Sequence, residues 1–438
     1  MVESKHMNES QTQTVAIIGA GISGLSCAHF LHQHGGKTDT GQPRFDITVF
    51  ESDSRIGGHT ATKVFDMNGT QWAIDTGFIV YNDWTYPNFI RLLDELGVEN
   101  QTTDMSFSVS CQATGLEYSG SSINSLFAQR INLLRLNYWR MLNDILRFNR
   151  QAVADLSSNK INSGITLGEY LRLNRYSGLF ESHYLVPMCA AIWSASTDVV
   201  QQFPLLFFVQ FFKNHGLLSV NDRPQWRVIK GGSHSYLAPL VTSFKDRIRC
   251  NTKISRVIRQ TEGVTVEMHN GSVQHFDQVV FACHSDQALA LLADPTQEEQ
   301  TVLGNMPYQN NEVVLHTDEN LLPANRRAWA AWNYLLNGEK QERAVLTYNM
   351  NILQSIHSDT TFCVTLNATD KIDPHRIIGE YNYSHPVFTL ESVQAQGRWS
   401  EINGVRNTWY CGAYWANGFH EDGISSALRV ANKLGVHW

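Results

Sequence analysis

The chain has 438 residues, of which 42% are hydrophobic and 17% are charged, and its formal net charge is −7. This composition supports a large folded core and argues against broad nucleic-acid binding, which requires a basic surface. The seven cysteines include no C-x-x-C pair, so they favour reduced thiols in a cytoplasmic protein over a disulfide framework or a zinc site.

Neither a targeting segment nor a membrane span is evident in the sequence. Residues 1–13 are polar and predict a disordered tail rather than a signal peptide. The most apolar stretch, Phe203–Phe212, is shorter than the ~18 residues that a membrane span requires. It is consistent with a buried core helix, with the lining of an apolar pocket or with contact at a membrane surface.

The first informative motif joins a strand, a glycine turn and a helix. Val15–Ile18 is typical of a buried parallel strand, and Leu25–Leu31 has a helical pattern. Between them, GAGISG at 19–24 matches the dinucleotide-binding fingerprint G-x-G-x-x-G. Its glycines permit a tight turn, a close approach of backbone N–H groups to a pyrophosphate and close packing of helix on strand. The helix N-terminus adds a partial positive charge.

The next segment supplies an acidic residue and further glycine turns. Ile47–Glu51 predicts a second strand, and Glu51 at its end is expected to bind ribose hydroxyls. The usual spacing is about 20 residues, so the polar segment Gly35–Pro43 is expected to be an inserted surface loop. Arg55–Thr60 contains a glycine pair that lets the chain pass close to a cofactor, and Ile74–Phe78 repeats an acidic-glycine turn.

Two segments, 86–225 and 304–396, are expected to form a substrate-binding domain. The first is helical, because Ile123–Arg150 has apolar residues at helical spacing. These residues are Leu126, Ile131, Leu134, Tyr138, Met141, Ile145 and Phe148. The second segment predicts strands at Glu312–Thr317, Ala344–Tyr348 and Thr361–Leu366.

Cofactor-type patterns recur in two later places. Strand-like stretches at Lys253–Ile258 and Phe276–Cys283 follow the pair Gly231-Gly232. Near the end of the chain, Trp409–Tyr414 predicts a strand, and a helix begins around Gly418–Gly423. The expected cofactor domain is therefore discontinuous and comprises 14–85, 226–303 and 397–438. An ordinary capped helix is the alternative interpretation of the last segment.

Together these motifs resemble the FAD-dependent amine oxidase and carotenoid desaturase superfamily. Longer stretches are similar to a bacterial family of FAD/NAD-binding, amine-oxidase-like flavoproteins and to the N-terminal flavoprotein portion of plant cyclopropane fatty acid synthases. These stretches are Asp104–Ser110, Tyr184–Ser194, Arg223–Trp226, Gly231–Tyr236, Ser384–Val387, Gly412–Tyr414 and Gly418–Gly423. The resemblance implies an α/β fold, with a Rossmann-like three-layer ββα domain for FAD and an α+β substrate domain.

The resemblance also implies a set of cofactor-binding residues. Ile254 would contact the adenine through its backbone, and the last helix would direct its N-terminus at the flavin ring. The full expected set is Gly19, Ala20, Gly21, Ile22, Ser23, Gly24, Glu51, Ser52, Arg55, Gly57, Gly58, His59, Thr60, Gly77, Phe78, Ile254, Ala282, Gly412, Glu421, Asp422, Gly423 and Ile424. We expect no metal site, since no H-E-x-x-H motif or cysteine pair is present.

Two residues typical of amine oxidases are missing. The strand Asn310–His316 has no lysine to reach the flavin N5 through water, and Tyr381–Pro386 has no cysteine to link the flavin. FAD is therefore predicted to bind non-covalently. Hydride removal from a C–H bond calls for a base near neutral pKa. The candidates are His420, His385 and His316, each with a structural role as the alternative.

The sequence leaves three functions open. The first is hydride abstraction from an apolar, fatty-acyl substrate, giving desaturation or isomerisation; it follows from the resemblance to proteins associated with lipid-modifying methyltransferases. The second is amine oxidation. The third is a flavin-binding partner or regulator of a lipid methyltransferase. In each case we expect a cytoplasmic location, with peripheral contact at the inner face of the membrane.

Overall fold

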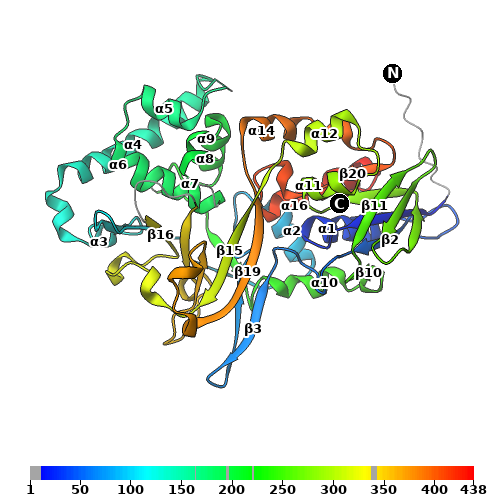
Figure 1. Cartoon of the computed structure of the whole chain (residues 1–438), viewed down its shortest axis with the longest axis horizontal. Coiled ribbons are helices and arrows are strands. Elements are labelled where there is room, and N and C mark those ends of the chain that lie inside the picture. The colour runs from blue at the N-terminus through cyan, green and yellow to red at the C-terminus, as the bar shows by residue number, and fades with distance from the viewer. Residues whose placement is uncertain (1–10, 163, 194–196, 220, 337–342) are drawn as a thin grey trace.

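The chain folds into two lobes that lie side by side (Figure 1). The computed structural model describes residues 11–162, 164–193, 197–219, 221–336 and 343–438. Residues 1–10 of the expected tail lie outside these ranges, and Gln13 already belongs to the first strand. Within the described ranges, no helix combines the length and the apolar character needed to cross a membrane.

One lobe contains the strands of the expected cofactor domain, and we call it the cofactor lobe; the other is the substrate lobe. The cofactor lobe is built on a parallel sheet whose strands come from three separated parts of the chain. Its order is β10-β2-β1-β14-β20. The strands are β1 (Gln13–Ile18), β2 (Phe45–Phe50), β10 (Ile248–Arg249), β14 (Gln278–Phe281) and β20 (Thr408–Tyr410). Val15, Ala16 and Ile17 are fully buried, as expected for a sheet covered on both faces. A three-stranded antiparallel sheet belongs to the same lobe: β11 (Ile254–Arg259), β12 (Val264–Met268) and β13 (Val273–Phe276).

The second lobe contains a seven-stranded mixed sheet of order β19-β15-β18-β17-β16-β7-β8. Its strands are β7 (Phe107–Cys111), β8 (Glu117–Ser119), β15 (Tyr308–His316), β16 (Trp332–Leu336), β17 (Val345–Asn349), β18 (Cys363–Leu366) and β19 (Ile377–Pro386). Two small sheets complete the strands: β3 (Thr62–Met67) with β4 (Thr70–Asp75), and β5 (Val80–Asn82) with β9 (Trp226–Ile229) and β6 (Asn100–Thr102).

Helices α3 to α9 gather at one end of the molecule, in the substrate lobe (Figure 1). They are α3 (Ile123–Leu126), α4 (Leu136–Ser157), α5 (Leu167–Leu173), α6 (Gly178–Phe180), α7 (Val186–Trp193), α8 (Thr197–Gln201) and α9 (Leu205–Asn214). The other helices are α1 (Ile22–Gln33), α2 (Pro87–Glu95), α10 (Leu237–Val241), α11 (Ser285–Leu291), α12 (Gln297–Gly304), α13 (Met350–Leu353), α14 (Leu390–Gly397), α15 (Trp399–Ile402) and α16 (His420–Lys433).

One helix predicted from apolar spacing is wrong. The segment 123–150 is divided into α3, the 3₁₀ helix η1 (Arg130–Leu134) and α4. Arg135 lies between the last two with an extended backbone, φ −93° and ψ 107°, which interrupts the helical register. As a result Ile131 and Leu134, which the pattern placed in the core, are exposed.

The apolar stretch at 203–212 is a buried core segment. Its helix α9 buries Leu205, Phe208, Val209, Phe211 and Phe212. Contact with a membrane through this stretch is therefore wrong, because these side chains already pack inside the protein.

Candidate active site

The glycine turn between β1 and α1 leaves room for a phosphate group. Gly19 has φ +107°, and a Cβ on Gly24 would lie 1.9 Å from the Gly19 oxygen, so both positions require glycine. A Cβ on Gly21, in contrast, would meet no atom within 4 Å. The turn therefore leaves open space at Gly21, next to the N–H groups at the start of α1.

Glu51 connects the end of β2 with this turn. Its Oε2 accepts the Ala20 N–H at 2.8 Å, and its Oε1 accepts the Asp53 N–H at 3.0 Å and the Ser52 hydroxyl at 3.2 Å. The carboxylate therefore lies beside the glycine turn, at the place where the sequence predicted a ribose contact.

The loop 55–60 packs directly against the glycine turn. The Gly57 N–H donates to the Ala20 oxygen at 2.7 Å, and a Cβ on Gly58 would lie 3.2 Å from the Gly21 Cα. The Arg55 guanidinium donates to the carbonyls of Gly58 at 2.8 Å and Thr60 at 3.1 Å. Arg55 thus shapes the loop through its own backbone rather than pointing at a ligand.

The later predicted residues close the other side of the turn. A Cβ on Gly24 would lie 3.1 Å from the Ala282 Cβ, and a Cβ on Gly423 would lie 2.8 Å from Ile22. Helix α16 therefore begins against the start of α1. Ile424 and Ile254 are buried, and the Gly412 N–H donates to Ser426 at 2.8 Å.

Two predicted cofactor ligands have other partners. Glu421 accepts the Phe89 N–H at 2.9 Å and the Asn88 side-chain amide at 2.7 Å, at the start of α2. Asp422 accepts the Phe419 N–H at 2.9 Å and the Asn417 N–H at 3.1 Å. Both carboxylates satisfy backbone donors at helix starts. A contact of these two residues with the cofactor stays a prediction.

His420 occupies a closed hydrogen-bond network instead of an open catalytic position. Its Nε2 lies 3.0 Å from the Thr60 hydroxyl and 3.3 Å from the Tyr236 hydroxyl. Its ring stacks on Phe78, with 3.5 Å between centroids. Burial lowers the pKa of His420 well below its usual value. His420 is therefore a neutral positioning residue, because protein groups already engage its Nε2.

His385 is held as one tautomer by its neighbours. Asn367 donates to the Asn311 Oδ1 at 2.9 Å, and the remaining Asn311 amide donates to the His385 Nδ1 at 3.0 Å. The proton of the neutral ring therefore sits on Nε2. Burial, and then the neighbouring His284, lower the pKa of His385 to about 4. Since its Nδ1 already accepts the Asn311 amide and its Nε2 carries the proton, the neutral ring has no free atom to accept a proton from a substrate.

His316 lies outside this group, which corrects its prediction as a base. It ends β15, whereas Tyr308 at the beginning of that strand stacks on His284. Eight residues of strand separate the two ends by roughly 25 Å. The His316 Nε2 bonds Thr365 at 2.7 Å and its Nδ1 accepts the Asp318 N–H at 3.0 Å, a satisfied structural arrangement.

The sequence predicted His59 only as a cofactor-binding residue and gave no sign that it could accept a proton. It follows the glycine pair, and its ring lies 5.3 Å from His385 and 5.4 Å from Tyr383, measured between centroids. The residue is partly exposed, but its Nε2 is buried and has no hydrogen-bond partner. Burial, and then the rings of His385 and His284, lower the pKa of His59 to about 3. An unpaired acceptor atom thus faces the space beside the glycine loop.

Comparison with known proteins identifies the family. Residues 22–349 match the family described as flavin containing amine oxidoreductase. The chain belongs to this family. FAD is accordingly its cofactor, and the predicted FAD-dependent oxidoreductase class is confirmed. The open turn at Gly21 fits the pyrophosphate of a bound dinucleotide.

Solved structures confirm the fold prediction. A fatty acid isomerase from P. acnes has a TM-score of 0.70 at 15% identity, covering 98% of this chain and 100% of that one. Putrescine oxidase has a TM-score of 0.67 at 15% identity, with coverage of 97% and 99%.

Curated relatives match over shorter stretches. Amine oxidase B of Bos taurus is 22% identical over 290 residues, which are 61% of this chain and 49% of that protein. Coproporphyrinogen III oxidase of Staphylococcus aureus is 51% identical over 47 residues, 11% of this chain and 9% of that protein. The chain thus spans half or less of these relatives. Similarity to plant cyclopropane fatty acid synthases stays a prediction.

An aromatic wall in this flavoprotein leads up to His420. We define it as Trp193, Phe207, Phe211, Phe388 and Phe419. Centroid distances are 4.6 Å from Trp193 to Phe211, 5.0 Å from Phe207 to Phe388 and 5.5 Å from Phe211 to Phe419. Trp193, Phe211 and Phe388 of this wall are buried. Since Phe419 directly precedes His420, the wall extends this apolar packing to the edge of the cofactor-binding loops.

FAD is expected to be released when this flavoprotein is denatured. The thiol near the glycine turn is Cys283, and burial raises its pKa to about 12. A protonated thiol is a poor nucleophile, so it does not form a flavin link. Mass spectrometry of denatured holoprotein should therefore give the polypeptide mass, 49.5 kDa. Flavin remaining attached to the polypeptide would contradict the prediction.

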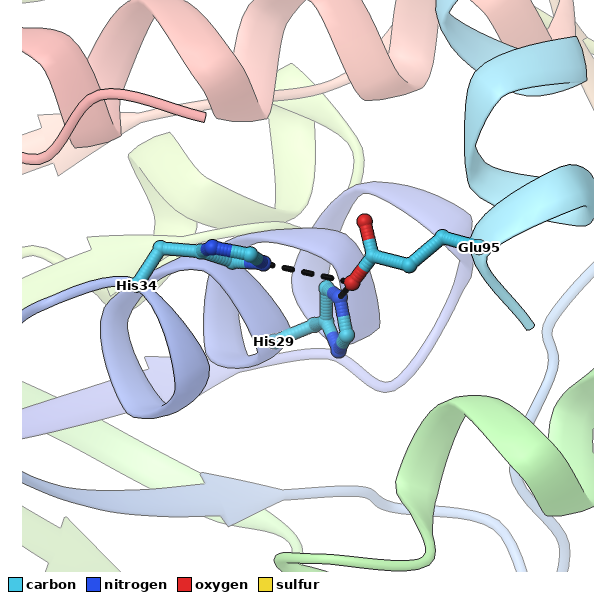
Figure 2. Close-up of side chains that lie close together, drawn as sticks. All are labelled: His29, His34 and Glu95. Atoms are coloured by element: carbon cyan, nitrogen blue, oxygen red, sulfur yellow. Dashed lines mark hydrogen bonds and ion pairs between the residues drawn. The ribbon is translucent and has the colours of Figure 1, made fainter.

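A separate cluster lies away from these loops, between the end of α1 and α2 (Figure 2). The Nε2 atoms of His29 and His34 lie 2.9 and 3.2 Å from the Glu95 Oε1, and the Trp438 indole donates to Oε2 at 2.6 Å. These side-chain types bind transition metals. However, a metal-bound histidine donates its second N–H to an acceptor, and the buried His29 Nδ1 has no partner. We therefore interpret the cluster as a set of hydrogen bonds that joins α1, α2 and the C-terminal Trp438.

Removing the hydrogen bonds to Glu95 with Glu95→Ala should lower the free energy of unfolding by about 1–3 kcal/mol. Burial lowers the pKa of His29, and hydrogen bonds from Trp438 and His29 outweigh burial and lower the pKa of Glu95. Both shifts mean that the unfolded chain binds more protons, so their stabilisation is lost as the pH falls below 6.5. Glu95 itself opposes the lowering of the His29 pKa. Thermal unfolding of the variant should therefore show a steeper loss of stability between pH 6.5 and 4.5, and a shallower one below pH 4.5, where the Glu95 carboxylate no longer contributes. The matched control is Glu99→Ala, which removes an exposed ion pair with Lys230 and should change little.

Proposed function

We propose that this flavoprotein abstracts a hydride from an apolar, fatty-acyl substrate, which is thereby desaturated or isomerised. The observation that carries the proposal is the aromatic wall ending at a group of neutral histidines. His59, His385 and His420 all have lowered pKa values because they are buried. Aromatic packing next to neutral histidines favours an apolar substrate over a charged one. The solved fatty acid isomerase, which has the same fold, is compatible with this proposal.

The side chains of this chain have distinct tasks in the proposed reaction. FAD, when bound, supplies two-electron redox chemistry. Thr60, Tyr236 and His420 fix the loop that follows the glycine pair. The unpaired Nε2 of His59 is the atom able to accept a proton from the substrate. The C–H next to a carbon that has lost a hydride is strongly acidic, so a base whose pKa is lowered to about 3 is strong enough. The aromatic wall orients the chain of the substrate and excludes water.

Amine oxidation is the second candidate. The neighbouring rings of Tyr381 and Tyr383, with centroids 6.5 Å apart, favour it, because aromatic rings attract amino groups, as the Lys63 Nζ at 4.0 Å from the Tyr381 ring shows. Putrescine oxidase shares the fold over nearly the whole chain. The missing lysine on β15 and the neutral histidine group argue for the acyl substrate instead.

Anaerobic mixing of the holoprotein with linoleic acid or with putrescine distinguishes the two candidates. For desaturation we expect linoleic acid to bleach the visible absorbance of the flavin. For isomerisation the flavin spectrum recovers and gas chromatography detects a shifted double bond. Bleaching by putrescine, with no change of linoleic acid, would overturn the proposal in favour of amine oxidation.

A further inference from the structure

The far end of the substrate lobe carries large apolar side chains in water. We define the apolar tip as Ile123, Ile131, Leu133, Leu134, Leu136 and Trp139. Ile123, Leu134 and Leu136 are 80%, 80% and 85% exposed, and the other three are about half exposed. Twelve large hydrophobic residues are exposed in the described part of the chain, and six of them lie within 123–139. Such a concentration marks an interaction surface.

Hydrogen bonds hold the tip in this exposed form. The Arg130 guanidinium donates to the carbonyls of Asn124 and Phe127 at 3.2 and 2.6 Å, which joins η1 to α3. The Trp139 indole donates to the Leu133 carbonyl at 2.9 Å, which joins η1 to α4. The inner face of α4 is already buried through other residues, including Tyr138, Met141 and Phe148. The apolar side chains therefore have no inward position to move to.

The segment around the apolar tip is positively charged, although the formal net charge of the whole chain is −7. Arg130, Arg135, Arg140 and Arg150 are exposed, and none of them takes part in an ion pair among the described residues. Asp144 is the one acidic residue between 121 and 150. It is buried and pairs with Arg147 at 3.1 Å.

We propose that the apolar tip docks on a membrane surface that contains anionic lipids. Leucine, isoleucine and tryptophan side chains enter the interfacial layer, while neighbouring arginines stay at the lipid phosphates. A second copy of the chain is a poorer occupant. A symmetric dimer would place the same patch on both sides and bring the unpaired arginines together.

The position of the tip also bears on the route by which a substrate reaches the aromatic wall. Phe148 on α4 contacts Phe208 on α9, and Phe211 on α9 contacts Phe419 of the aromatic wall. Helix α4, which begins in the tip, therefore packs directly on α9, the helix that carries Phe207 and Phe211 of the wall. The docking inference does not depend on the acyl substrate, because vesicle binding is measured without turnover.

The test is co-sedimentation of the full-length holoprotein with vesicles. We expect binding to phosphatidylcholine vesicles that contain about 30% phosphatidylglycerol, and weaker binding to pure phosphatidylcholine and at high salt. Leu134→Ser/Leu136→Ser should weaken binding by at least about tenfold. Arg135→Gln/Arg140→Gln should weaken it about tenfold on the anionic vesicles and little on the neutral ones.

Two matched double variants serve as controls. Val273→Ser/Val405→Ser removes two exposed apolar residues elsewhere, and Lys245→Gln/Lys371→Gln removes two exposed charges elsewhere. Both should bind like the wild type. Retained flavin absorbance reports that each variant folds.

A direct measurement needs no binding-deficient variant. Brominated lipids in the same vesicles should quench part of the tryptophan fluorescence, and this part should be missing in Trp139→Phe. Absence of vesicle binding by the wild type, or quenching that Trp139→Phe leaves unchanged, would overturn the proposal. So would a wild-type dimer in sedimentation velocity that Leu134→Ser/Leu136→Ser converts to monomer, since the tip would then be a contact between copies.

Discussion

Gly21→Asp should fold and remain colourless. A Cβ at Gly21 meets no atom within 4 Å, and the backbone there has φ −77°, so the substitution fits the chain itself. Its carboxylate would occupy the space that the turn leaves for the FAD pyrophosphate. Two like charges about 4 Å apart repel by about 4 kcal/mol at an effective dielectric constant of 20, which corresponds to a loss of about 10³ in affinity. The ratio of flavin absorbance to protein absorbance measures how much FAD the purified variant retains.

Gly178→Asp is the matched control for this prediction. Gly178 is exposed, its Cβ would also meet nothing within 4 Å, and it begins α6 in the substrate lobe. This variant should retain FAD. Added FAD at about 100 times its dissociation constant should stabilise the wild type by about 2.7 kcal/mol and leave the Gly21→Asp protein unchanged. A yellow Gly21→Asp protein with normal flavin content would contradict the placement of the pyrophosphate.

The turn was predictable because its chemistry is local. Gly19 and Gly24 are required by contacts within one strand-turn-helix unit, and Glu51 lies on the neighbouring parallel strand. Sequence spacing carries this information without knowledge of the rest of the fold. The Asp422 carboxylate caps its own helix, a local contact that the ordinary capped helix anticipated. The bond from the Phe89 N–H to Glu421 could not be predicted, because only tertiary packing brings the start of α2 to α16.

The roles of the candidate histidines were less predictable, since they depend on strand register. The pairing of β15 with β19 sets Asn311 beside His385, and the same pairing carries His316 to the far end of the sheet. His59 and His385 are 326 residues apart in a chain whose two lobes meet only after folding. No periodicity in the sequence reports that contact.

The apolar tip shows a second kind of failure. Ile131 and Leu134 fit the helical spacing of a core-facing stripe, but the extended residue Arg135 changes the direction of the chain before α4. Apolar spacing identifies which residues avoid water, not which surface covers them. In this protein the uncovered residues are the ones for which we propose a lipid partner.

His59→Gln should retain FAD yet reduce the flavin about 10²–10⁴-fold more slowly with the true substrate, which is the range for loss of a proton-transfer group. Glutamine preserves hydrogen bonding and volume but does not accept a proton at physiological pH. Stopped-flow bleaching under anaerobic conditions, with linoleic acid as the first substrate tested, gives the rate. Because the pKa of His59 is lowered to about 3, the wild-type rate should stay constant as the pH falls from 8 to about 5.

The same substitution at His316 is the control that distinguishes an effect on the reaction rate from an effect on stability. His316 is also buried, with its pKa lowered to about 4 by burial, but it lies at the opposite end of β15. His316→Gln should lower the thermal stability and leave the bleaching rate of the folded protein unchanged. His420→Asn should instead lower FAD occupancy, because it breaks the bond that holds Thr60. Equal bleaching rates in His59→Gln and wild type would remove His59 from the reaction, since its unpaired Nε2 would then have no part in moving the proton.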